Sequence, residues 1–445
     1  MPFQTDAARK QKKTGSAAGG QKEWYRLDLS ATVYPTLQRK NFSSVYRLSV
    51  LLKEPIRPDV LQKAVDLSMK RFPTYKVAIH KGLFWRYLEP NNRPGPFVQP
   101  DIANPCMPMY FRAGNRYLLR VYYYDRRISL ECHHSLGDGT GGMCVLQTIT
   151  AVYLRLLGAE ISNGFFVLDI NEKPDPEELE DAYLRYANAQ VCPPRPAEKT
   201  YRVRGTPEPF HTLNIIDGIM SVKEVNAAAK KYGATITEYL NSVLLYALLN
   251  KQFLDPHIRL YPVRIALPVN LRRFFPSRTL RNFITMVYPS IDPRLGSYTF
   301  EEIVTEVRNF MRYYINEKFL RGDITTNAAT KRNPFIRVVP LFLKDVVVRT
   351  FYRRVQDKNS SAGLTNMGAL KVPEDMKPYI ERFDIYMGQP FSSRTNCAIV
   401  SFEDTLTVNF ASCIIEADVE RLFFRKLVED GVRVKIESNR TFREE

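Results

Sequence analysis

The segment HHSLGDG, residues 133–139, contains the side chains best suited to acid–base chemistry in this chain. Histidine can accept and return a proton near neutral pH, because its ordinary pKa lies close to that range. Asp138 follows His134 by four residues, and the small neighbours Gly137 and Gly139 allow another chain segment or a substrate to approach closely. The aspartate could orient His134 as in a hydrolase triad, or it could anchor the loop by pairing with a cation. The anchoring role is favoured, because no G-x-S-x-G motif occurs.

The elements around this segment must position His134. Residues 117–124 and 128–134 are rich in strand-forming side chains, and the polar residues 125–127 between them predict a β-hairpin. Alternation along the second strand places His134 on the apolar face and His133 on the other. Burial disfavours a charged imidazole, so we expect His134 to be neutral and able to act as a base.

A helix is predicted after the loop, because apolar residues recur at helical spacing between Val145 and Leu156, and Gly158 is placed to end it. The motif therefore lies in a strand–loop–helix corner. Taken alone, it would also fit a core histidine followed by an ordinary tight turn.

The rest of the chain predicts an α/β protein with two lobes. Residues 1–22 are expected to be a disordered basic tail, residues 23–168 an N-terminal lobe, residues 169–212 a Pro- and acid-rich connection, and residues 213–445 a C-terminal lobe. Strand 44–52 and helix 58–72 open the first lobe. The second lobe has three S/T-x-x-E helix starts, at Ser221, Thr235 and Thr299, a hairpin of residues 397–402 and 406–412, and a last helix over 418–428.

Composition narrows the class of protein. The formal net charge of +17 favours an anionic partner, such as a nucleotide-bearing co-substrate, an acidic protein, nucleic acid or a phospholipid surface, and charge alone does not choose among them. The 6 cysteines are widely spaced and form no metal-ligand pattern, so we expect no metal and a reducing, cytoplasmic setting. No apolar run is long enough to predict a transmembrane segment.

The segment HHSLGDG resembles the HHxxxDG signature of the chloramphenicol acetyltransferase-like acyltransferase superfamily, which includes alcohol acetyltransferases, plant BAHD acyltransferases and condensation domains. Further segments resemble that superfamily in the same order along the chain. They are the opening WYRLDLSATVYP from Trp24, KRFPTYK (residues 70–76), LPVNLRRFFPSRTLRNF (residues 267–283) and LTNMG (residues 364–368). The opening is most similar to bacterial alcohol acetyltransferase-like proteins, and the DFGWG segment of the plant subgroup is missing.

The resemblance implies a two-lobed fold in which each lobe has a mixed sheet with flanking helices, and a tunnel between the lobes holds the active site. It implies that His134 is the catalytic base, that Asp138 forms a structural salt bridge with Arg272, and that Gly139 keeps the backbone beside the substrate uncrowded. His133 is expected to give structural support. The expected reaction transfers an acyl group, acetyl first among the candidates, from acyl-CoA as co-substrate to a small alcohol or amine. No Walker or GxGxxG loop occurs, so the residues that bind CoA are not predicted.

Three other interpretations stay open at this point. A condensation-type enzyme would take its acyl group from an acidic acyl carrier protein, and a non-catalytic protein would retain the fold alone. The mixed apolar and basic segment PLFLKDVVVRTFYRR, residues 340–354, would suit a membrane surface or a helix packed on the core. No nucleic-acid partner is expected.

Overall fold

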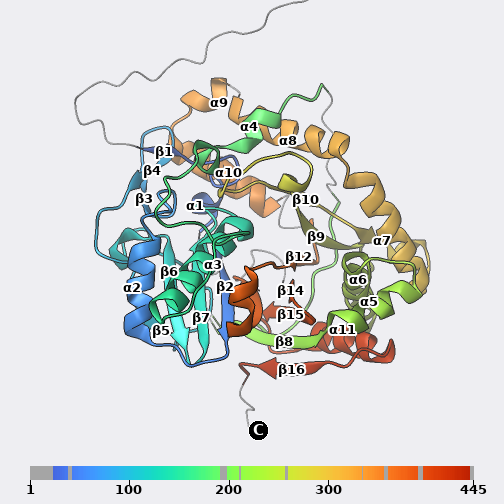
Figure 1. The fold of residues 1–445 in the computed structure, drawn as a ribbon. Helices are drawn as coiled ribbons and strands as arrows, with labels where there is room; N and C mark the ends of the chain where they lie inside the picture. The colour runs from blue at the N-terminus through green and yellow to red at the C-terminus, as the bar shows by residue number, and fades with distance from the viewer. Residues whose placement is uncertain are drawn as a thin grey trace, which may run out of the picture.

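A computed structural model describes residues 24–38, 43–190, 198–209, 212–255, 259–332, 334–354, 359–388 and 394–440. The described part mixes helices and strands in two lobes, with the earlier and later parts of the chain on opposite sides (Figure 1). The tail predicted for residues 1–22 lies outside the described residues. Among the described helices, none is long and apolar enough to cross a membrane.

The first lobe is built on a five-stranded sheet in the order β13-β2-β7-β6-β5. Its strands are β2 (Val45–Leu52), β5 (Val98–Pro100), β6 (Leu119–Tyr124), β7 (Arg127–His133) and β13 (Ile380–Met387). The helices α2 (Pro58–Ser68) and α3 (Gly139–Leu156) share its hydrophobic core. A small sheet of β1 (Tyr25–Arg26), β4 (Arg86–Pro90) and β3 (Val77–Lys81) and the one-turn helix α1 (Tyr34–Leu37) complete this lobe.

The second lobe is built on an eight-stranded sheet in the order β10-β9-β12-β14-β15-β8-β16, with β11 also paired to β9. The strands are β8 (Asn214–Ser221), β9 (Val263–Asn270), β10 (Ile284–Val287), β11 (Ser290–Ile291), β12 (Ala362–Ala369), β14 (Thr395–Phe402), β15 (Thr405–Ser412) and β16 (Lys435–Ser438). The helices are α4 (Ala182–Tyr186), α5 (Val222–Lys231), α6 (Ile236–Leu254), α7 (Phe300–Tyr314), α8 (Glu317–Arg332), α9 (Pro334–Val338) and α11 (Asp418–Glu429). Helix α10 (Leu341–Arg354) follows α9 in the chain and lies against α1 and the small sheet of the first lobe. The long helix α6 lies in the middle of this lobe's core.

Several sequence predictions are confirmed. The hairpin that leads to His134 is present as antiparallel β6 and β7, although its turn has two residues rather than three. The later hairpin is β14 and β15, and helices follow where they were predicted. Thr235 and Thr299 begin helices with complete capping boxes. Ser221 caps α5, but the Glu224 side chain pairs with Arg433 instead of returning to the cap.

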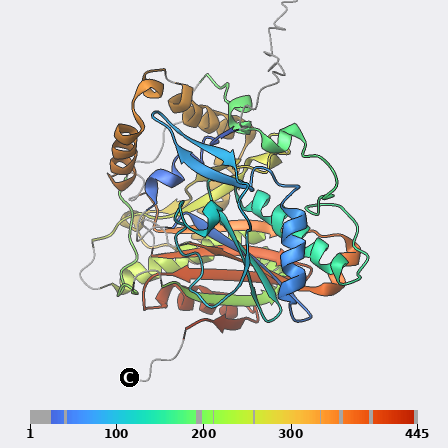
Figure 2. The same ribbon diagram turned by 90° about the vertical axis from the view of Figure 1, so that its left-hand side faces the viewer.

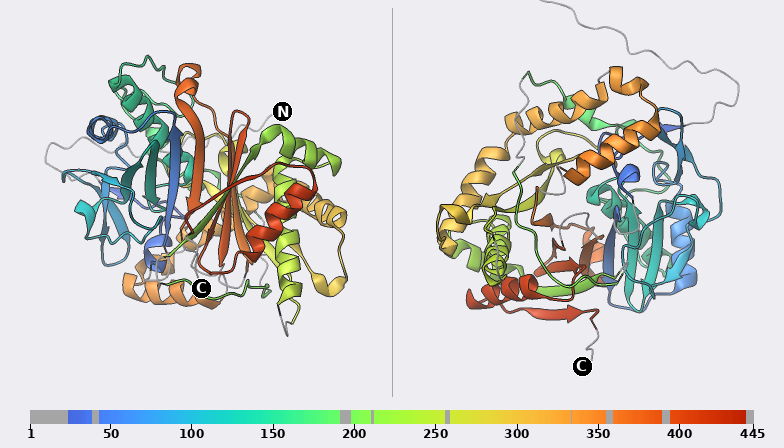
Figure 3. Two further views of the ribbon diagram at one scale, coloured as in Figure 1. Left: turned by 90° about the horizontal axis from the view of Figure 1, so that it is seen from below. Right: turned by 180° about the vertical axis from the view of Figure 1, so that it is seen from behind.

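Strand β13 belongs to the later part of the chain and yet pairs with β2 of the first lobe, as the orange and blue strands in the left panel of Figure 3 show. The predicted boundary between the lobes at residues 169–212 does not indicate that a strand from the later part of the chain joins the first sheet. Phe383 and Ile385 of β13 are buried in the core of the first lobe, where Phe383 also packs against Phe402 with their ring centroids 5.4 Å apart. Strand pairing between residues so distant in the chain leaves no periodic signal in the sequence.

The position of β13 in the first sheet predicts that Phe383→Ala will destabilise the fold by about 3–5 kcal/mol, because the substitution opens a cavity in a core that both parts of the chain fill. Denaturant unfolding followed by circular dichroism measures the change. Glu381→Ala is the control on the same strand, since its side chain is 42% exposed. A cost for Phe383→Ala as small as that of the control would contradict the role given to β13.

Candidate active site

The segment HHSLGDG forms the turn between β7 and α3. Its backbone is held from two sides, because the amide of His133 donates to Leu118 O at 2.9 Å and the amide of His134 donates to Ser44 O at 2.8 Å. Tyr46 reaches the far end of the turn and donates its hydroxyl to the carbonyl of Asp138 at 2.9 Å. The hairpin and the neighbouring strand β2 therefore fix where the two histidines lie.

The imidazole of His134 lies between two tyrosine rings. Tyr34 of α1 stacks on it with ring centroids 4.7 Å apart and an interplanar angle of 19°, and Tyr46 lies 4.6 Å away on a tilted plane. Burial in this setting lowers the pKa of His134 to about 4, although the nearby carboxylate of Asp138 partly opposes the shift. The side chain is therefore neutral at pH 7, the state that a general base requires.

His133 is fully buried and faces away from that pair of rings. Its Nδ1 accepts from the amide of Ser135 at 3.2 Å, and its ring meets Phe111 edge-on with centroids 5.3 Å apart. Burial lowers its pKa to about 3, with a further contribution from His134. These contacts fit a structural residue.

Asp138 uses both carboxylate oxygens to hold the backbone. Oδ1 accepts from the amides of Thr140 and Gly141 at 3.1 and 3.3 Å, and so caps α3. Oδ2 accepts from Arg272 Nη1 and from the amide of Phe283, each at 2.8 Å. Within the described residues, no hydrogen bond joins this carboxylate to the imidazole of His134. The geometry matches an anchor rather than a triad member.

Arg272 lies just after β9 and brings the second lobe to this carboxylate. Its side chain is only 12% exposed, and it also donates to the carbonyls of Thr279 and Arg281 at 2.9 and 2.6 Å. One guanidinium thus shapes the chain that follows it and ties that chain to the loop at Asp138. A planar donor with several N–H groups suits this task better than a lysine would.

The glycines of the loop permit close packing between the lobes. A Cβ at Gly141 would lie 1.9 Å from the carbonyl oxygen of Leu280, and one at Gly137 would lie 2.4 Å from it. At Gly139 a Cβ would lie 3.0 Å from Met367 Sδ. Other segments of this chain therefore make the closest approaches to these glycines. The expectation that Gly139 leaves room beside a substrate stays a prediction.

Asn282 was not among the predicted site residues, although it lies in a segment that the resemblance included. It is fully buried, and its Nδ2 donates to His134 O at 2.9 Å and to Asp28 Oδ2 at 3.0 Å. Asn366, the other asparagine of such a segment, bonds to Thr237 instead. Tyr34 was also missed, because nothing in its spacing relates it to a histidine 100 residues away.

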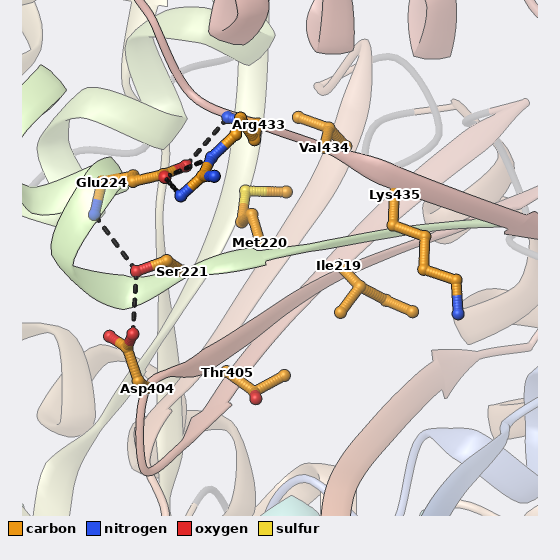
Figure 4. Close-up of a pocket in the computed structure, with 9 residues that line it drawn as sticks. All are labelled: Ile219, Met220, Ser221, Glu224, Asp404, Thr405, Arg433, Val434 and Lys435. Atoms are coloured by element: carbon orange, nitrogen blue, oxygen red, sulfur yellow. Dashed lines mark hydrogen bonds and ion pairs between the residues drawn. The ribbon is translucent and has the colours of Figure 1, made fainter.

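A separate groove lies on the outer edge of the second sheet, beside β8 and β16 (Figure 4). An ion pair between Glu224 and Arg433 and a hydrogen bond from Ser221 to Asp404 lie in its wall. Its lining residues are Ile219, Met220, Ser221, Glu224, Asp404, Thr405, Arg433, Val434 and Lys435. None of the predicted site residues is among them, so this groove has no part in the chemistry considered for His134.

Solved structures share this fold. Polyketide synthase associated protein 5 from Mycobacterium tuberculosis matches with a TM-score of 0.58 and 14% identity over 90% of this chain and 96% of that chain. Trichothecene 15-O-acetyltransferase from Fusarium sporotrichioides matches with a TM-score of 0.58 and 14% identity over 94% and 96%. The condensation domain of the Monacolin K polyketide synthase matches with a TM-score of 0.54 and 13% identity over 92% and 96%. At the level of sequence, no family model and no curated protein matches this chain.

The chain therefore has the two-lobed mixed α/β fold of chloramphenicol acetyltransferase-like proteins, as the sequence predicted. Identities this low establish the fold and leave the chemistry to be argued from the site.

The shared carboxylate predicts the outcome of a double-mutant cycle. Asp138→Asn and Arg272→Met should each cost about 3–5 kcal/mol of unfolding free energy, because each removes the opposite charge from a buried ion pair. The double variant should cost less than the sum of the two, and denaturant unfolding measures all three. Arg425→Ala is the control, since its pair with Glu429 is exposed and should contribute at most about 1 kcal/mol. Strict additivity would contradict the coupling.

The lowered pKa values of the two histidines predict acid-sensitive stability. His133 has a folded pKa of about 3 and His134 one of about 4, both below the ordinary value of 6.5, so the unfolded chain takes up their protons first as the pH falls. Each then supports stability fully above pH 6.5 and loses that support as the pH falls toward its folded value. Between pH 7 and pH 5, His133→Gln should weaken the pH dependence of unfolding by about 2 kcal/mol. An unchanged dependence would count against the buried neutral state.

Proposed function

We propose that this chain is an acyltransferase that moves an acyl group, acetyl first among the candidates, from a CoA thioester to a hydroxyl or amine, with His134 as general base. The observation that carries the proposal is the imidazole of His134, packed against the rings of Tyr34 and Tyr46 at the junction of the lobes in a chloramphenicol acetyltransferase-like fold. Its lowered pKa agrees with the role of a base. One of the similar structures is by its name an acetyltransferase.

In the proposed reaction, His134 takes the proton from the acceptor hydroxyl or amine as that atom attacks the thioester carbonyl. A bond from the acceptor to the carbonyl carbon forms, and a tetrahedral oxyanion results. The intermediate collapses as the carbon–sulfur bond breaks, and the proton held by His134 passes to the departing thiolate. The acceptor attacks directly, so no covalent acyl-enzyme is required.

The surroundings of His134 suit this proton transfer. The charge of Asp138 favours the imidazolium that forms when the proton is taken, while Asn282 holds the backbone of His134 through its carbonyl oxygen. Arg272 keeps the carboxylate in place, so Asp138 and Arg272 are positioning residues in this proposal, as His133 is. The route of both substrates through a tunnel between the lobes belongs to the same proposal.

A second candidate is a condensation-type transfer from an acyl carrier protein. The fold shared with a condensation domain favours it, and the net charge of +17 suits an acidic carrier. Thiol release from acetyl-CoA, measured with a panel of alcohols and amines, separates the two. Turnover with a phosphopantetheinyl carrier donor and none with CoA thioesters would select the second candidate, and no turnover with either would favour a non-catalytic protein.

His134→Ala should lower the rate of acyl transfer by at least about 100-fold, because it removes the base while the rings around it remain. The assay is thiol release with whichever donor supports turnover, and circular dichroism checks the fold. His80→Ala is the matched control, since His80 lies on β3 against Glu89 and Tyr87, apart from these rings. Full activity in His134→Ala would overturn the mechanism.

A further inference from the structure

Helix α10 presents its apolar side chains to solvent. The large residues of its outer face recur at helical spacing, and each is about half exposed or more. They are Phe342 (65%), Leu343 (47%), Val346 (59%), Val347 (67%) and Phe351 (50%). A helix packed on a soluble core shows the opposite arrangement, with its apolar stripe turned inward.

The inner face of α10 makes polar contacts with the first lobe through three side chains. Asp345 Oδ2 lies 2.6 Å from Arg86 Nη2, and Asp345 Oδ1 accepts from the Thr36 hydroxyl at 2.9 Å. Lys344 donates to Phe84 O at 2.9 Å, and Arg349 donates to Thr36 O at 2.9 Å. These contacts fix the orientation of the helix, so its outward apolar face is a property of the fold and not of a loose segment.

The exposed surface continues beyond α10. The tip of the β3–β4 hairpin lies beside the helix (Figure 2), and the amide of Leu341 donates to Leu83 O at 2.8 Å. Leu83 is 68% exposed, Trp85 52% and Val338, at the end of α9, 68%. We call the five residues of the outer face together with these three the α10 face. A group of exposed apolar side chains on neighbouring elements marks an interaction site more often than single exposed residues do.

Charge indicates what the α10 face binds. Residues 331–354 contain seven basic residues (Lys331, Arg332, Arg337, Lys344, Arg349, Arg353 and Arg354) and one acidic residue, Asp345, which is already paired with Arg86. A second copy of the chain would bring the same positive charge against itself. Anionic phospholipid would attract it, while phenylalanine, leucine and tryptophan side chains enter the boundary between headgroups and acyl chains.

We infer that the α10 face docks this protein on the surface of an anionic phospholipid bilayer. The apolar side chains of α10 and the β3–β4 tip enter the interfacial layer, and the net positive charge of the segment 331–354 attracts the anionic headgroups. The protein lies on the bilayer and does not cross it. This inference stands on the surface alone, so it holds or fails separately from the chemistry proposed at His134.

Co-sedimentation of the full chain with vesicles tests it. Vesicles of equal parts phosphatidylcholine and phosphatidylglycerol should pellet the protein, and vesicles of phosphatidylcholine alone should pellet at least tenfold less. Raising the salt from 0.1 to 0.5 M should weaken the binding, because salt screens the attraction of the headgroups. Absence of pelleting with the anionic vesicles would overturn the inference.

The variant Phe342→Gln with Val346→Gln should reduce binding to the anionic vesicles at least tenfold. Both side chains are exposed, so the fold and its melting temperature should not change. The matched control is Phe253→Gln with Leu254→Gln on α6, where the side chains are 54% and 61% exposed. Equal losses in the two double variants would overturn the assignment to the α10 face.

Light scattering on a size-exclusion column distinguishes the rival occupant. A monomer that pellets with anionic vesicles supports the inference. A dimer that the α10 variant dissociates, with no pelleting by either vesicle, would assign this face to a second copy of the chain and overturn the bilayer.

Discussion

The carboxylate of Asp138 is the constraint on which the candidate site depends. It accepts from the first turn of α3 through one oxygen, and from Arg272 and the amide of Phe283 through the other. The helix belongs to the first lobe and the other two partners to the second, so one side chain joins the lobes at the residues beside His134. A buried carboxylate needs this many partners, because leaving it short of donors would cost several kcal/mol.

The position of the imidazole follows from that junction. Arg272 fixes the carbonyls of Thr279 and Arg281, and the next residue, Asn282, then reaches the carbonyl of His134. Glycines at 137 and 141 are required because the carbonyl of Leu280 lies where their side chains would be. Tyr34 and Tyr46 pack against the ring, and desolvation rather than a charged partner lowers its pKa. Residues of the second lobe thus hold the backbone of the candidate base, which the first lobe supplies.

Local pattern predicted much of this from the sequence. The hairpin to His134, the helix after it and the two complete capping boxes follow from spacing over a few residues, and the ion pair of Asp138 and Arg272 followed from resemblance rather than from pattern. What the sequence did not reveal depends on contacts between distant residues. The pairing of β13 with β2, the stacking of Tyr34 on His134 and the bond from Asn282 to His134 join segments more than 90 residues apart, where periodicity carries no information. The segment 340–354 was left between two interpretations because its helical spacing shows which side chains share a face, and not which way that face turns.

Helix α1 connects the α10 face to the candidate base. Tyr34 lies on the imidazole of His134, and two residues later Thr36 donates its hydroxyl to Asp345 and accepts from Arg349 through its carbonyl. Arg86 binds both Thr36 and Asp345, so α1, α10 and the small sheet share one set of polar contacts. Because a single helical turn carries both Tyr34 and Thr36, α10 cannot move away from the lobe without breaking contacts that hold α1 over the ring. The polar side chains Asp345 and Arg349 of α10 therefore bind the helix that stacks Tyr34 on His134. Because these side chains face the first lobe, the apolar side chains on the opposite side of α10 face solvent.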